Sequence, residues 1–82
     1  SDKKPIYARD ISVGDLLIDY YDNQPDMICS ALFVLSVEDW SYSPLEIQGR
    51  KFTVWNLLHE ERYEYRWDDE PLVFDKVLKF EP

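Results

Sequence analysis

The chain has few of the residues that mark an enzyme or a secreted scaffold. It holds one cysteine, one histidine, one methionine and two glycines in 82 residues. The single Cys29 excludes an internal disulfide and favours a reducing compartment. The longest apolar run, Ala31 to Leu35, is far short of the roughly 20 residues that cross a membrane. The polar N-terminus carries no secretory signal. We therefore expect a cytoplasmic chain without membrane contact.

Cations are also scarce. Nine Lys and Arg residues stand against seventeen Asp and Glu residues, which gives a net charge of −8. Such a surface repels nucleic-acid phosphate unless its cations cluster, and here they are scattered along the sequence. We expect no direct nucleic-acid binding. The acidic excess itself has two interpretations, which are solubility alone or a surface that binds a basic partner.

The length and the apolar content predict one small domain that spans residues 1–82, with residues 1–5 frayed. A chain of this size buries only about 60–65% of its unfolded surface, so the core must be compact. The composition suits that requirement, since 45% of the residues are hydrophobic and 16% are aromatic. Aromatic side chains bury a large area each, which helps a small sheet protein without disulfides.

The firmest local prediction is a β-hairpin built from Lys51–Leu58 and Arg62–Trp67. Both runs are rich in β-branched and aromatic residues, and the second alternates strictly. His59, Glu60 and Glu61 lie between them as the turn. The rest of the fold is expected to be a sheet grown around this hairpin.

Two further strands are predicted before the hairpin. Leu16–Tyr21 follows a Gly14-Asp15 turn, and Asp22–Asp26 has the composition of a loop. Met27–Val37 is the longest candidate strand, with a helix as the competing interpretation; its clean alternation and the lack of a capping signal favour the strand. Its expected apolar face is Met27, Cys29, Ala31, Phe33, Leu35 and Val37.

The segments flanking the hairpin have weaker patterns. Glu38–Pro44 is predicted to be a loop that holds two large aromatic residues. Leu45–Gln48 is expected to form a short edge strand, with Gly49 in the turn that follows. After a break at residues 68–71, the expected elements are a 3₁₀ turn at Leu72–Lys76 and a last strand at Val77–Phe80.

This element order predicts a mainly β fold, either a small five-stranded SH3-like barrel or a strongly bent antiparallel sheet with one 3₁₀ turn. The runs Val13–Leu17, Phe33–Val37, Val54–Leu57 and Leu78–Phe80 resemble small SH3-like β-barrel proteins of tailed phages. The chain departs from their pattern at Tyr42–Arg50 and in its long second strand. The resemblance implies a non-enzymatic domain that acts on a protein of the bacterial host, and it assigns no site residue.

The sequence holds no catalytic signature, so we expect no enzyme and no cofactor. His59 is the only histidine, and its place in a turn predicts exposure. Cys29 falls on the apolar face of its strand, which predicts a buried and inert thiol. Asp68 and Asp69 are adjacent and point in different directions, so they predict no acid–base pair.

The acidic residues also lack the spacing of a metal site. A calcium loop requires an Asp-x-Asp-x-Asp-Gly run and a closing glutamate. That pattern is missing from the run considered, which is Asp15, Asp19, Asp22 and Asp26. We expect no metal.

The alternating stripe Tyr63, Tyr65 and Trp67 has two interpretations, which are core packing and an exposed aromatic platform. Nucleic-acid platforms have basic neighbours, whereas acids outnumber Arg62 and Arg66 here. An exposed stripe would therefore favour a protein partner, since Tyr and Trp are common contact residues.

We predict an acidic protein-interaction domain that binds and modulates a host protein. The candidate partner-binding residues are Trp40, Tyr42, Glu60, Glu61, Tyr63, Tyr65, Trp67, Asp68, Asp69 and Glu70. One alternative is a DNA mimic whose carboxylates occupy the site of a nucleic-acid-binding protein. A second alternative is a structural or virion component that oligomerises. The sequence leaves the oligomeric state open.

Overall fold

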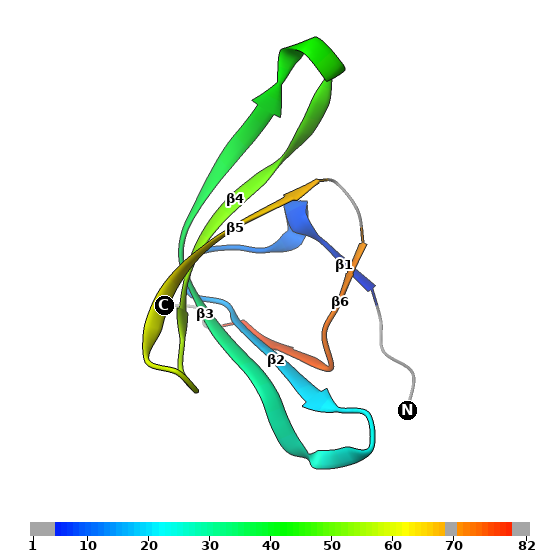
Figure 1. Cartoon of the computed structure of the whole chain (residues 1–82), viewed down its shortest axis with the longest axis vertical. Helices are drawn as coiled ribbons and strands as arrows, with labels where there is room; N and C mark the ends of the chain where they lie inside the picture. The colour runs from blue at the N-terminus through cyan, green and yellow to red at the C-terminus, as the bar shows by residue number, and fades with distance from the viewer. Residues whose placement is uncertain (1–4, 69–70, 80–82) are drawn as a thin grey trace.

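The fold is mainly β and antiparallel. A computed structural model describes residues 5–68 and 71–79, with the side chains of residues 42, 43 and 68 outside that description. One sheet has five strands in the order β5-β4-β3-β2-β7, the other pairs β1 with β6, and the sheets are not closed into a barrel. The elements are β1 Pro5–Tyr7, η1 Ala8–Asp10, β2 Leu16–Tyr21, β3 Gln24–Tyr42, η2 Ser43–Leu45, β4 Ile47–Asn56, β5 Glu61–Asp68, β6 Pro71–Val73 and β7 Lys76–Leu78 (Figure 1).

The predicted central hairpin is confirmed as β4 and β5. Its register runs from Gly49 opposite Asp68 to Asn56 opposite Glu61. The turn begins earlier than expected, because Leu57 and Leu58 lie in it rather than in the strand. The side-chain Oδ1 of Asn56 accepts the N–H groups of Leu58 at 2.9 Å and His59 at 3.3 Å. This local bonding competes with the ladder and ends the strand.

The predicted first strand and the turn before it are also confirmed. Gly14 has a φ of +92°, a conformation that glycine adopts without steric cost. Its N–H donates to the Val34 carbonyl at 2.8 Å. The buried carboxylate of Asp15 accepts the Ser12 N–H at 2.9 Å and the Lys79 ammonium at 2.7 Å. These bonds fix the chain where it enters β2.

β3 is much longer than predicted, and this lengthening corrects two loop assignments. Only Asp22 and Asn23 form the first turn, and residues 38–42 continue the strand. The acidic residues there pair with cations of the facing strand: Glu38 lies opposite Lys51 and Asp39 opposite Arg50. Tertiary pairing thus outweighs the loop-like composition.

The predicted edge strand and turn at Leu45–Gly49 are wrong in detail. Leu45 belongs to η2, and Glu46 has a positive φ of 53° where the chain reverses. Gly49 lies inside β4.

The predicted apolar face of β3 is wrong for most of its length because of a β-bulge. The register shifts between Val34 and Ser36, so one extra residue is inserted at Leu35. Leu32 and Val34 belong to the core before the shift, and Val37 packs against it afterwards. An alternation read straight through residue 35 therefore assigns the first half of the strand to the wrong face.

The core lies on one face of the five-stranded sheet, which we call the inner face. Phe52, Val54 and Leu17 are fully buried there, and Ala8 and Ile11 from the η1 region pack onto them. Ile6, Leu72 and Phe74 from around the small sheet cover the same side. The opposite side of the sheet is the outer face.

The end of the chain differs from the prediction in one element. Leu72–Lys76 forms no 3₁₀ turn, because Pro71–Val73 pairs with β1 instead. The last strand is confirmed as β7, which pairs with β2. Phe80 lies outside the described residues.

Candidate functional site

The most prominent surface feature is the part of the β3–β4 hairpin formed by residues 38–51, which we call the arm. It extends beyond the rest of the sheet, with η2 at its tip (Figure 1). The molecule accordingly measures 43 Å along its long axis and 26 Å along the other two. Leu45 at the tip is 66% exposed.

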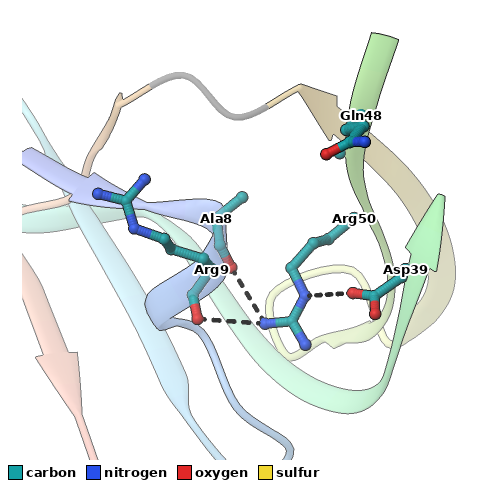
Figure 2. Close-up of a pocket in the computed structure, with 6 residues that line it drawn as sticks. Ala8, Arg9, Asp39, Gln48 and Arg50 are labelled. Atoms are coloured by element: carbon teal, nitrogen blue, oxygen red, sulfur yellow. Dashed lines mark hydrogen bonds and ion pairs between the residues drawn. The ribbon is translucent and has the colours of Figure 1, made fainter. Parts of the chain in front are cut away.

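Arg50 fastens the base of the arm to the N-terminal segment. Its Nη1 donates to the backbone carbonyls of Ile11 at 3.1 Å, Arg9 at 3.3 Å and Ala8 at 3.5 Å. Figure 2 shows the guanidinium between η1 and Asp39 of β3. Several carbonyls on one guanidinium fix the direction of the arm, because Arg presents its donors in a rigid plane.

The ion pair between Arg50 and Asp39 is weaker than these carbonyl bonds. The Arg50 Nε lies 3.4 Å from the Asp39 Oδ1, but this buried nitrogen makes no hydrogen bond within the described part of the chain. The Asp39 side chain is 94% exposed. Exposed pairs contribute at most about 1 kcal/mol, so the carbonyls hold Arg50 in place.

Two open clefts flank the arm near Gly49. The first has a volume of about 360 Å³ and is lined by Ala8, Arg9, Asp39, Gln48, Gly49 and Arg50 (Figure 2). The second has a volume of about 430 Å³ and is lined by Asp39, Trp40, Ser41, Gln48 and Gly49. Trp40 lies directly opposite Gly49 in the ladder, so no facing side chain covers that position. The clefts combine an indole, an amide and three charged side chains, which suits recognition by hydrogen bonding and apolar contact.

The aromatic stripe of β5 packs on the inner face, so its core interpretation is confirmed. Tyr63, Tyr65 and Trp67 are half-buried against the core. The rings of Tyr65 and Trp67 stack at a centroid distance of 5.4 Å, and Trp67 lies 4.7 Å from the ring of Phe52. The hydrogen bond from the Tyr63 hydroxyl to Glu61 raises the pKa of Tyr63, and desolvation adds to the shift.

The predicted contact residues do not gather on one surface. Paired residues of a ladder share a face, so Trp40 lies on the outer face and the β5 aromatics lie on the inner face. Glu60 is exposed in the β4–β5 turn, with a φ of 54°, and Glu61 begins β5. For Tyr42 and Asp68 only the register is described, opposite Ile47 and Gly49. Residues 69 and 70 lie outside the described residues.

The polar residues considered for chemistry are dispersed. Cys29 is half-exposed rather than buried as predicted, because a register shift leaves it unpaired between Ser30 and Ile28. Desolvation and then the carboxylate of Asp19 raise the pKa of the Cys29 thiol. Across residues 5–68 and 71–79, no three His, Cys, Asp or Glu residues come together as a metal site. No helix in this part of the chain is long and apolar enough to span a membrane.

Arg50, Gln48 and Gly49 were missed as site residues in the sequence. A signal for them exists: the acidic pair Glu38-Asp39 and the basic pair Arg50-Lys51 lie at matching distances from the tip of the arm. Complementary pairs so placed predict cross-strand contacts and hence a long hairpin.

No protein-family model, no curated protein and no solved structure matches the chain. Its function is therefore inferred from its own contacts, burial and charge.

Proposed function

We propose that this chain is a non-enzymatic protein-interaction domain that binds its partner through the arm. Two features of the arm support this proposal: Trp40 lines the second cleft next to Gly49, and Leu45 is exposed at the tip. Tryptophan in a concave site is the residue type that contributes most to protein–protein affinity. An arm fastened at its base by Arg50 presents these side chains with little loss of conformational entropy.

Charge contributes little to this contact. Glu38 pairs with Lys51 at 3.0 Å and Asp39 pairs with Arg50 at 3.4 Å, so two of the three acids of the arm are locally balanced, and Glu46 is the third. Binding through Trp40 should therefore persist at high salt, which screens exposed charges. The DNA-mimic alternative predicts the opposite behaviour, since its attraction lies between exposed charges.

The non-enzymatic part of the proposal rests on the lining of the clefts. Their described lining residues offer no histidine or cysteine, and Ser41 is their only hydroxyl. A nucleophile without a neighbouring base is weakly reactive. If the resemblance to SH3-like proteins of tailed phages extends to function, the partner is a protein in the cytoplasm of the bacterial host.

The test is a pull-down from bacterial lysate with the tagged chain, its Trp40→Ala variant and the control Tyr21→Ala. Tyr21 is an exposed aromatic residue, 47% accessible, and it lies at the far end of β2. We expect one dominant protein that is retained at high salt, is lost with Trp40→Ala and is kept with Tyr21→Ala. A DNA-binding protein released by salt would favour the mimic, and a stable oligomer without a partner would favour a structural component.

A further inference from the structure

A row of side chains crosses the outer face of the sheet below the arm. The strand register aligns one residue from each of the five strands, namely Arg62, Trp55, Phe33, Leu16 and Leu78. Strands lie about 4.8 Å apart, so the row is about 19 Å long. Its residues alternate along their strands with the core residues Val54, Leu32 and Leu17, which places the row on the opposite face.

Most of this row is apolar, and the described elements that pack on the sheet, β1, η1 and β6, cover the inner face instead. Trp55 is 36% exposed, and Phe33, Leu16 and Leu78 are half-buried. The next pair on this face, Ile18 and Ala31, is buried at 8% and 6% exposure, so the accessible apolar area ends at the row itself. Figure 1 shows β1 and β6 on the other side of the sheet, where they pack against the core. Contiguous exposed apolar surface is typical of a contact site.

The same face gathers cations that are scattered in the sequence. Register places four of the nine Lys and Arg residues on it, which are Lys51, Arg62, Arg66 and Lys76. The same register places three acids on this face, Glu38, Glu64 and Asp68, so the local sum is +1 on a chain of −8.

The ends of the apolar row carry two cations that have no ion pair within the described part of the chain. Lys51 pairs with Glu38 at 3.0 Å, and Arg66 lies 3.9 Å from Glu64. Arg62 ends the row on β5, and Lys76 flanks its other end on β7. Neither makes an ion pair with a described residue. An occupant of the row would therefore meet a positive charge at each end.

Three occupants can be weighed against these features. Two copies packed face to face would bring like charges together, which is unfavourable. Single-stranded nucleic acid needs a series of exposed rings, and Trp55 is the one exposed ring of this row, on a chain whose net charge repels phosphate. An acidic protein segment with an apolar centre matches both the apolar row and its charged ends. Trp, Phe and Arg are also the types enriched at protein contacts.

We propose that the outer face binds an extended segment of a partner protein that has apolar residues at its centre and carboxylates at both ends. This inference rests on the proposed function, because it gives the interaction domain a second contact surface and names the chemistry of its partner. An extended segment of about six residues spans the row, since a strand rises about 3.3 Å per residue. The contact is separate from the Trp40 cleft, although both lie on the same face of the sheet.

The experiment measures fluorescence anisotropy of a labelled peptide, Glu-Glu-Leu-Phe-Leu-Leu-Glu-Glu, against the full chain. The controls are the same peptide with lysine in place of glutamate, and oligothymidylate. Net charge alone predicts a preference for the lysine peptide, whereas the outer face predicts about tenfold tighter binding of the glutamate peptide. Preference for the lysine peptide, equal binding, no binding, or stronger binding of oligothymidylate would each overturn the inference.

Substitutions on the outer face test whether the glutamate peptide binds there. Arg62→Glu and Trp55→Ala should each weaken binding of the glutamate peptide about tenfold. Tyr21→Glu adds a negative charge at the far end of β2, outside the row, and should alter binding less than about twofold. Thermal melting checks that each variant is folded. If Trp40→Ala abolishes capture from lysate but the peptide shows no preference, the arm proposal stands and the outer-face inference fails.

Discussion

The two faces of the β4–β5 hairpin use neighbouring residues for different purposes. On the inner face, Phe52 and Val54 are fully buried. On the outer face, Lys51 and Trp55 stay accessible next to β5 residues with charged side chains. The strand period of two separates these sets completely, so one short stretch builds both the core and an accessible surface.

Strand pairing can concentrate charges in space that are scattered in the sequence. Positions 51, 62, 66 and 76 look unrelated along the chain, yet register brings them to one face. The scatter of cations along the sequence therefore does not carry over to the outer face. Strand pairing, and not proximity in sequence, decides where charge accumulates.

The largest contrast between the faces should come from truncating one aromatic residue on each. Phe52→Ala removes a fully buried ring in contact with Trp67 and should lower the free energy of unfolding by about 3–5 kcal/mol. Trp55→Ala on the outer face should lower it by about 1 kcal/mol. Urea denaturation followed by circular dichroism measures both. Equal losses would contradict the assignment of faces.

A buried carboxylate and an exposed one provide the next contrast. Asp15→Ala leaves the Ser12 N–H and the Lys79 ammonium without their acceptor, and should cost about 2 kcal/mol. Asp39→Ala removes a 94% exposed side chain and should cost less than about 1 kcal/mol. The same urea titrations apply. A larger loss for Asp39→Ala would show that the arm depends on its surface ion pair.

Adjacent cations of β4 give a smaller and more local contrast. Arg50→Ala removes the donor to three backbone carbonyls and should cost about 1–2 kcal/mol. Lys51→Ala on the outer face should cost less than about 0.5 kcal/mol. Hydrogen exchange of residues 8–11 should accelerate only in the Arg50 variant. Unchanged exchange there would refute the role of Arg50 at the base of the arm.

The smallest effect concerns Cys29, where the sheet register is interrupted. Because desolvation and the Asp19 carboxylate both disfavour the thiolate, the pKa of this thiol is raised. Its alkylation by iodoacetamide should therefore reach half its limiting rate at a higher pH than a free cysteine does. Asp19→Asn removes a negative charge and should shift that midpoint to lower pH. A midpoint below that of free cysteine would contradict this environment.

The sequence predicts the elements whose pattern is local. The central hairpin, β2 and β7 follow from alternation and turn chemistry, and core packing, which the structure shows for the β5 stripe, is one of the two interpretations that its alternation allows. The bulge at Leu35 has no sequence marker, so the face of β3 was reversed. The sequence pattern does not predict the arm, because the pairing of its two strands depends on contacts with the facing strand. The open sheet, the Arg50 contacts and the cationic outer face depend on long-range register, which alternation alone does not reveal.

The most direct test follows the indole N–H signals of the three tryptophans by NMR while the glutamate-flanked peptide is added. Trp67 lies on the inner face, Trp55 in the apolar row and Trp40 on the arm. Tryptophan-to-phenylalanine variants assign the signals. We expect the Trp55 signal to shift with saturation while the Trp67 signal stays in place. A shift of Trp67 with Trp55 unchanged would contradict a binding surface on the outer face.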